Sequence, residues 1–282
     1  MNLIDRRKTD DIAKYVFWGI GALTIVILIT IIGFILINGL PHISIEFLTQ
    51  SPRDFGAEGG IFPMIVSTIY VTFFAVLIAT PFALAVAVYL HEYTNNGKVT
   101  QVIRYSLELL ASLPSIIFGL FGLAFFVEFL NLGWCVLSAS LTLALMAIPT
   151  IIRTTENALD SIPQTYKEAS LGMGATKLQT IIKVIIPAAI PVIVTGVVLG
   201  MARAIEETAA IMYTVGSSTG VPITVFDPAR PLPLHLYMLA TESISLDNTY
   251  ATAAVLIILI LIITITTNYF VERYSKKITG AQ

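Results

Sequence analysis

The 282-residue chain has little charge and a single cysteine. Charged residues make up 12% of it, whereas a soluble domain carries about 25%. Because 56% of the residues are hydrophobic, the composition indicates a membrane protein. A formal net charge of −2 gives no basic excess, so no nucleic acid partner is expected. Cys135 has no second cysteine to pair with, and we interpret it as a buried thiol in an apolar segment.

The chain also lacks the motifs of several enzyme classes. Its three histidines, His42, His91 and His235, are far apart, and no pair has the spacing of metal ligands. No segment has the Gly-x4-Gly-Lys-Ser/Thr spacing of a phosphate-binding loop, and the His-Glu-x-x-His and Gly-x-Ser-x-Gly motifs are absent. We therefore expect no catalytic residue, no metal and no cofactor on this chain, which argues against an intramembrane enzyme.

What the sequence has in excess is long apolar segments. A helix needs about 20 such residues to cross a bilayer. Six segments meet this requirement: 15–37, 64–90, 107–130, 132–152, 188–213 and 251–270. Pro81, Pro114 and Pro149 interrupt three of them. The first segment is too long for a signal peptide. We therefore predict an all-α membrane protein with a tail at 1–14, a transmembrane domain at 15–272 and a tail at 273–282.

Lysine and arginine placement predicts the orientation. Of the 16 basic residues, all but Arg53, Arg203 and Arg230 fall in the two tails and in the loops after the second and fourth segments. Cytoplasmic loops carry such an excess. Both termini are therefore predicted to be cytoplasmic. The outward loop 216–250 is long and rich in proline and apolar residues, which predicts an ordered loop containing a short helix.

The predicted inward loop, 153–187, is strongly patterned. Pro163 fits the first turn of a helix, and Gly172 and Gly174 indicate that one helix ends and another begins nearby. The loop is therefore predicted to form two short helices with a sharp bend, projecting into the cytosol as a knob.

The same loop resembles the EAA loop of ABC-importer permeases. Glu168-Ala169-Ser170 is followed by Gly174 and, after the expected interval, by Ile186-Pro187. Ser170, Val184 and Ile186 depart mildly from the family pattern. In that family the loop docks into a groove of a separate ATPase subunit. The resemblance implies a coupling role for six residues: Glu168, Ala169, Ser170, Gly172, Gly174 and Ala175.

A wider resemblance covers roughly residues 59–250. The stretches GGIFPMIVSTIYVTFFAVLIATPFALAVAVYLHEY and ASLPSIIFGLFGLAFFV are similar to the phosphate-specific ABC importer, and to its PstA-type rather than its PstC-type permease. The resemblance implies a MetI-like bundle with a core at 62–272 in a prokaryotic inner (plasma) membrane, surrounded by lipid. It also implies the following partners: a PstC-type permease, two PstB-type ATPases that bind ATP and Mg, a PstS-type external phosphate-binding protein, and inorganic phosphate.

Three charges inside the fifth apolar segment are candidates for the translocation path. The family carries Arg-Ala-Ile-Gly-Glu-Thr-Ala here; this chain has Arg203, Glu207 and Thr208 in register and Glu206 in place of the glycine. Arg203 and Glu207 are four apart, which predicts a shared helical face with Glu206 beside it. An unpaired arginine at mid-span costs about 2.5–3.5 kcal/mol. The cluster is therefore predicted to face the bundle interior.

Alternatives remain open from the sequence. The cluster either only fixes helix packing, or lends positive potential to the passage of an oxyanion, with Glu206 opposing that potential. A nearby strip of small residues, Gly196, Gly200 and Ala204, is suited to close helix packing. The substrate is phosphate or another oxyanion such as molybdate or sulfate. A carrier driven by an ion gradient, with Glu206 and Glu207 as a proton relay, is the remaining alternative.

Overall fold

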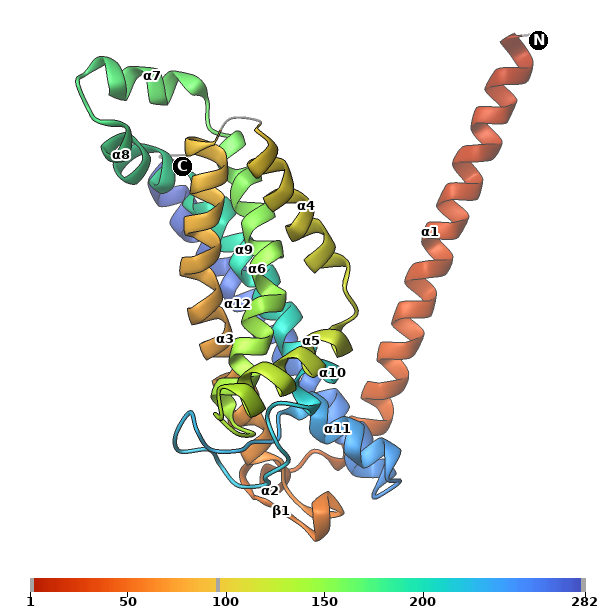
Figure 1. The fold of residues 1–282 in the computed structure, drawn as a ribbon. Coiled ribbons are helices and arrows are strands. Elements are labelled where there is room, and N and C mark those ends of the chain that lie inside the picture. Colours follow the sequence, from red (N-terminus) through yellow and green to blue (C-terminus); the bar gives the residue numbers. More distant parts are fainter. Residues whose placement is uncertain (1–2, 95–96, 280–282) are drawn as a thin grey trace.

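The computed structural model describes residues 3–94 and 97–279, with side chains over 10–94, 97–269 and at 273. Of the basic residues expected in the tails, Arg6, Arg7, Lys8, Lys276 and Lys277 have side chains outside this description. Figure 1 shows a long helical bundle from which α1 stands apart. The start of α1 and the end of α12 lie at the same end of the bundle as α7 and α8, whereas α11 lies at the opposite end.

Within the described residues, five long helices are apolar enough to cross a membrane, or six spans if one bent pair counts as a span. The five belong to α1 (Leu3–Gly39), α3 (Phe62–Val88), α6 (Val136–Asp160), α9 (Ile186–Glu206) and α12 (Leu246–Thr279). The bent pair is α4 (Lys98–Ser112) with α5 (Ser115–Gly122) and the π-helical turn η4 (Leu123–Phe129). The predicted helical membrane bundle is confirmed.

Shorter elements complete the chain. At the α11 end lie η1 (Leu40–His42), α2 (Ile45–Thr49), β1 (Pro52–Arg53), η2 (Asp54–Gly56), β2 (Glu58–Gly59), α10 (Ala209–Met212) and α11 (Leu232–Thr241). At the other end lie η3 (Tyr89–Tyr93), α7 (Gln164–Gly172), α8 (Lys177–Thr180) and η5 (Ile181–Ile185). Strands β1 and β2 form one short antiparallel pair. Helix α11 confirms the short helix that was predicted within 216–250.

The predicted third span is not a single helix. Helix α4 begins at Lys98 rather than at 107, and the chain bends by 100° between α4 and α5. The break falls at Leu113 and Pro114, where Leu113 is extended (φ −68, ψ 138). A proline lacks a backbone donor and disfavours helical geometry in the residue before it. Pro81 and Pro149, in contrast, lie inside continuous helices.

The bundle core is built by close approach of α3, α6 and α9. On α3, Ala75, Ala79, Ala83 and Ala87 are all fully buried, and α3 packs along α6. On α9, a Cβ at Gly196 would lie 2.6 Å from the Cβ of Thr154 in α6. The small-residue strip predicted on this segment therefore packs directly against a neighbouring helix, as expected.

The α11 end is closed by the loops. The backbone N–H of Leu232 donates to the Thr68 hydroxyl (2.8 Å), and Cys135 donates to the carbonyl of Thr214 (3.1 Å). Cys135 itself is fully buried, as predicted. Because backbone donors and acceptors in this region are paired, these loops form an ordered cover rather than loose connections.

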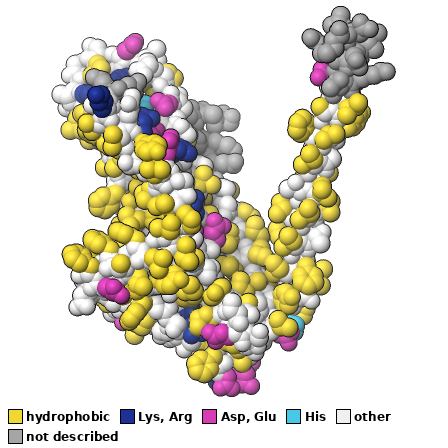
Figure 2. Space-filling model, turned by 45° about the vertical axis from the view of Figure 1, so that its right-hand side comes forward, with side chains coloured by type: hydrophobic (Ala, Val, Ile, Leu, Met, Phe, Trp, Pro, Cys, Tyr) yellow, Lys and Arg dark blue, Asp and Glu magenta, His cyan; other side chains and the backbone are white. Residues whose placement is uncertain are grey.

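Helix α1 leans away from the bundle. It meets α12 only at its end, where Phe34 and Tyr250 stack edge to face with centroids 5.8 Å apart and Gly39 lies against the Tyr250 carbonyl. Figure 2 shows hydrophobic side chains along the part of α1 whose side chains are described. Large apolar residues from Tyr15 to Ile37 are exposed. Such a surface requires lipid or another protein as its neighbour.

Candidate functional site

A cleft of about 720 Å³ lies between α4 and α6 and reaches the end of α9. We call it the charged cleft. Its charged lining residues are Arg104, Glu108, Arg153, Glu156, Asp160 and Arg203. Three arginines and three carboxylates thus face one space in a bundle that is otherwise mostly apolar.

Two ion pairs cross the charged cleft and tie α4 to α6. Arg104 Nη2 lies 2.9 Å from Glu156 Oε1, and Arg153 Nη2 lies 3.8 Å from Glu108 Oε1. Glu156 Oε1 accepts no aligned hydrogen bond, so the first pair is held by charge alone. Partly exposed pairs of this kind are worth about 1 kcal/mol or less. Ile103 and Leu107 of α4 also pack against the buried cluster of α3 and α6, so the two ion pairs add to an existing apolar contact.

Arg203 is the arginine of the charged cleft that makes no ion pair with the described residues. It lies in the last turn of α9, where the partial negative charge of the helix end favours a cation. Its side chain is exposed to the cleft. The charge of Arg203 also acts on the nearby Glu207 carboxylate, so a partly balanced positive potential remains available to a ligand.

The predicted shared face of Arg203 and Glu207 is wrong. Helix α9 ends at Glu206, and Glu207 has extended backbone geometry (φ −72, ψ 128). Two carboxylates at the end of a helix oppose its dipole, and the Glu207 carboxylate instead accepts a hydrogen bond from Ser115, the first residue of α5. A helix N-terminus favours such a negative group.

The two helix breaks meet each other inside the bundle. Helix α10, which resumes after the break at Glu207, packs against α5, which resumes after the break at Pro114. A Cβ at Gly119 of α5 would lie 2.8 Å from the carbonyl oxygen of Ala209 in α10. The backbones are in contact here, so the breaks support each other.

The structure places the other two path candidates beside Arg203 without giving them partners. Glu206 is exposed and Thr208 is half-buried. Neither side chain makes a hydrogen bond or ion pair with the described residues. Also within those residues, no group of three His, Cys, Asp or Glu side chains is placed to hold a metal ion.

The loop 153–187 contains the predicted short helix and sharp bend, as α7 and the turn after it. The predicted second short helix, α8, instead continues through η5 into α9 as one helix from Lys177 to Glu206. Helix α7 ends at Gly172, Gly174 has φ +86, and Thr176 and Gln179 form a capping box that begins α8. A positive φ is readily adopted by glycine. Pro163 is the N-cap residue of α7, one position before the predicted first turn.

The six coupling candidates divide between surface and interior. Glu168, Ala169, Gly172 and Gly174 are exposed, Ala175 is half-buried and Ser170 is buried. Ser170 shares a hydrogen bond with the Thr180 hydroxyl (2.9 Å), which joins α7 to α8. No described heavy atom lies within 4 Å of a Cβ built at Gly172 or Gly174. The open space at the two glycines is available to another protein.

Sequence reasoning missed the lining of the charged cleft on α4 and α6. It treated Arg104 and Arg153 as loop residues that report orientation, because both helices extend beyond the predicted spans. The signal was present: Arg104 and Glu108 are four apart, and Arg153, Glu156 and Asp160 follow at intervals of three and four. Such spacing places each set on one helical face.

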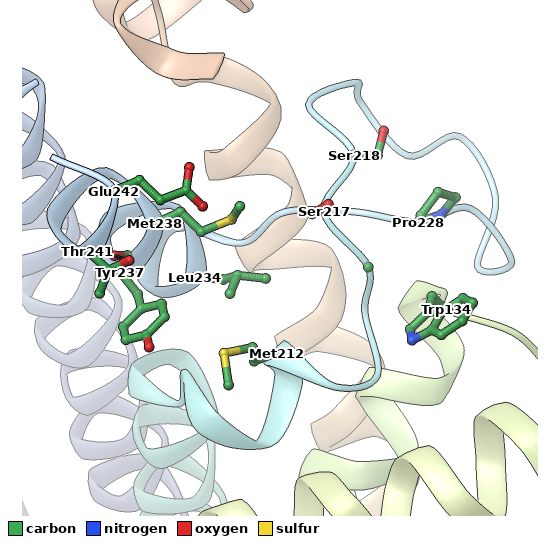
Figure 3. Close-up of a pocket in the computed structure, with 11 residues that line it drawn as sticks. Trp134, Met212, Ser217, Ser218, Pro228, Leu234, Tyr237, Met238, Thr241 and Glu242 are labelled. Atoms are coloured by element: carbon green, nitrogen blue, oxygen red, sulfur yellow. Dashed lines mark hydrogen bonds between the residues drawn. The ribbon is translucent and has the colours of Figure 1, made fainter. Parts of the chain in front are cut away.

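A second cavity, of about 660 Å³, lies at the opposite end of the bundle. We call it the α11 cavity. Figure 3 shows Leu234 and Met238 of α11, Met212 of α10 and Trp134 around it. Among its lining residues, Glu242 alone is charged. The α11 cavity therefore has no positive group with which to attract an anion.

His235 of α11 is buried near this cavity. Its side chain is 1% exposed, and its Nδ1 atom has no hydrogen-bond partner among the described residues. Burial, assisted by the nearby Arg230 guanidinium, lowers the pKa of His235 to about 4. The imidazole is therefore neutral near neutral pH and serves packing.

Comparison with known proteins agrees with this architecture. The profile of the binding-protein-dependent transport system inner membrane component family matches residues 79–280. The chain is 34% identical to a probable ABC transporter permease protein, YqgI of Bacillus subtilis, over 86% of this chain and 87% of that one. It is 32% identical to the phosphate transport system permease protein PstA of Haemophilus influenzae, over 77% and 76% of the two chains.

A solved structure shows the same fold. An inward-facing structure of the MetNI methionine ABC transporter superposes with a TM-score of 0.63 at 22% identity, covering 76% of this chain and 95% of that one. The six-span interpretation of the bundle, with α4 and α5 as one broken span, is that of an ABC-importer permease fold.

Proposed function

Because the chain belongs to the family of binding-protein-dependent transport system inner membrane components, we propose that it is the PstA-type permease of an ATP-driven importer of inorganic phosphate. As a member of that family it is a non-catalytic, multi-pass subunit of an ABC importer. It works with ATPase subunits, a second permease and a binding protein outside the membrane. The substrate, the orientation and the residue roles below are parts of the proposal.

The unpaired Arg203 in the charged cleft is the observation that carries the proposal. A guanidinium stays charged and presents a fork of donors that matches the oxygens of an oxyanion. The other two arginines of the cleft each have a carboxylate partner, so Arg203 is the one free to attract a passing anion. A permeating ion must also leave, which requires weak attraction. A single arginine surrounded by carboxylates meets that requirement.

The carboxylates of the charged cleft favour phosphate over a fully ionised oxyanion. Near neutral pH inorganic phosphate retains at least one P–OH group, whereas sulfate and molybdate have none. An ionised carboxylate only accepts hydrogen bonds. Asp160 of the cleft, and Glu206 at the end of α9, can therefore accept a hydrogen bond that hydrogen phosphate donates and that sulfate and molybdate cannot. The PstA name of the Haemophilus influenzae relative supports the same choice of substrate.

We assign α7 and α8 to the cytoplasmic side, where they dock onto the ATPase. Exposed apolar side chains project from this loop beside the open surface at Gly172 and Gly174, notably Tyr166, Met173 and Leu178. An exposed apolar knob of this kind is suited to a groove in a partner protein. ATP and Mg bind to that partner. The exposed α1 then covers the second permease, which completes the translocation path.

The test is substrate specificity in cells that lack the chromosomal copy of the gene. With the complete assembly supplied on a plasmid, we expect restored growth on limiting phosphate and uptake of labelled phosphate that excess sulfate or molybdate does not inhibit. Uptake must survive an uncoupler that leaves ATP intact. Inhibition by molybdate or sulfate would reassign the substrate. Collapse with the uncoupler would favour a carrier driven by an ion gradient.

A further inference from the structure

We call the loop 153–187 the coupling loop. Glu92 is a buried carboxylate at the end of α3 nearest to it. It lies in the π-helical turn η3, and its side chain is 2% exposed. Among the residues whose burial the structure describes, Glu92 and Arg230 are the buried charged side chains. Burying a charge costs several kcal/mol unless the charge is paired. Its partners therefore explain why a carboxylate is kept there.

The two helices of the coupling loop each send one lysine to this position. Lys167 of α7 donates to Glu92 Oε2 at 2.6 Å. Lys177, the first residue of α8, donates to the backbone carbonyl oxygen of Glu92, and its Nζ atom stands 4.7 Å from the centroid of the Tyr93 ring. The end of α3 is thus the point to which α7 and α8 are jointly attached by charge.

The same carboxylate reaches α6 through a histidine. Glu92 Oε1 lies 3.1 Å from His91 Nδ1, and His91 Nε2 lies 3.0 Å from Asp160 Oδ1. Asp160 is the last residue of α6 and lines the charged cleft. A continuous series of polar contacts therefore runs from Lys167 in the coupling loop to the wall of the cleft.

Next to this network, α3 and α6 are packed together as one unit. Ala79, Ala83 and Ala87 of α3 pack in a single buried cluster with Ala147 and Ile151 of α6. Close-packed helices transmit a displacement at one end as a rigid-body movement. A pull on the end of α3 is consequently felt along α6, which lines the charged cleft.

We propose that Glu92 is a positioning residue that transmits movement of the coupling loop to α3 and α6, and thereby to the charged cleft. The proposal rests on the proposed function, since it takes α7 and α8 as the ATPase-docking helices. It differs from a purely structural role in one respect: removing the pair leaves the complex assembled and hydrolysing ATP, but disconnects hydrolysis from the cleft.

The experiment reads the cleft directly and needs no substrate. Asn157→Cys places a thiol on the exposed lining of α6, and the native Cys135 is buried, so background modification is low. The complete assembly is labelled with a thiol reagent in the absence of nucleotide and with ATP trapped on the ATPase. In the parent background we expect trapping to change the labelling rate of this thiol by about threefold or more.

The variants are Lys167→Gln, Glu92→Gln, the two together, and Lys167→Arg. We expect Lys167→Gln to abolish the ATP-dependent change in labelling while complex yield and ATPase rate stay within about twofold, because a coupling contact is lost and the docking surface is retained. Lys167→Arg keeps the charge and is expected to restore the change. The double variant should match the single ones. Lys183→Gln, an exposed lysine of the same loop, is the matched control and should behave as the parent.

Three results would overturn the proposal: an unchanged labelling response in Lys167→Gln, loss of assembly in proportion to loss of response, or an equal loss in Lys183→Gln. Because Lys167→Gln leaves the buried Glu92 carboxylate without its lysine, the same criteria are applied to the double variant, in which that carboxylate is also removed. Failure of the phosphate assignment is a separate result: it would show as absent phosphate uptake by the parent assembly, whatever the labelling response.

Discussion

The charged cleft and the α11 cavity have similar volumes, about 720 and 660 Å³, and opposite chemistry. The first is lined by three arginines and three carboxylates and is crossed by two weak ion pairs. The second is lined by methionine, leucine, aromatic and small polar side chains with one glutamate, and it lies open to the surface. The difference is that only the charged cleft offers positive groups to an anion.

The largest expected effect comes from neutralising one charged side chain in the charged cleft and comparing it with the same change in the α11 cavity. Arg203→Gln should lower the initial rate of ATP-dependent phosphate uptake into proteoliposomes about a hundredfold, because charge-assisted contacts to the anion are lost. Glu242→Gln removes the charge of the α11 cavity and should change the rate less than about twofold. Equal rates for Arg203→Gln and wild type would reduce Arg203 to a packing role.

The next largest effect is on stability, and it compares a glycine in a helix–helix contact with a glycine that faces open space. Gly119→Val drives a side chain into the carbonyl of Ala209 and should destabilise the permease by about 2 kcal/mol, measured as thermal unfolding in detergent. Gly21→Val in α1 meets open space and is the control. If both variants unfold at the parent temperature, the contact between α5 and α10 is looser than described.

A third comparison uses two glycines with the same backbone geometry at opposite ends. Gly174 (φ +86) and Gly133 (φ +73) both face open space, so aspartate strains the backbone similarly at each, by about 1 kcal/mol. Gly174→Asp should reduce capture of the ATPase about tenfold, since it alters the docking surface. Gly133→Asp should leave capture unchanged. Similar capture by the two variants would contradict the docking assignment.

The smallest effect is a pH dependence at the α11 end. The folded-state pKa of His235, about 4, lies below its ordinary value of 6.5, so its contribution to stability is complete above pH 6.5 and is lost as the pH falls toward 4. Between pH 7.5 and 5.5 the loss should be about 1 kcal/mol, or about 2 °C in melting temperature. His235→Gln should remove this difference; an identical pH response would assign it to another group.

The parts of the fold that depend on local pattern were predictable. The apolar segments, helix α7 with the bend at Gly174, and the short helix within 216–250 follow from hydropathy, Gly174 and proline placement. The strip at Gly196 and Gly200 was also anticipated, because small residues at helical spacing indicate close packing whatever the partner.

What could not be predicted depends on contacts between distant segments. Helix α9 ends at Glu206, where α10 packs on α5 and the Glu207 carboxylate accepts a hydrogen bond from Ser115. No local signal in the sequence identifies Ser115 as that partner. The bend at Pro114 was expected only as an interruption, since two prolines in similar surroundings leave their helices intact. The attachment of Glu92 to Lys167 joins residues 75 positions apart and required the assembled bundle.

The central claim is that phosphate passes through the charged cleft beside Arg203. The most direct measurement is the rate at which an anionic thiol reagent modifies Ala111→Cys, an exposed cleft-lining position on α4, in the complete assembly hydrolysing ATP. The account predicts that added phosphate slows this modification, that sulfate does not, and that Arg203→Gln removes the protection. Modification at the same rate with and without phosphate would contradict it.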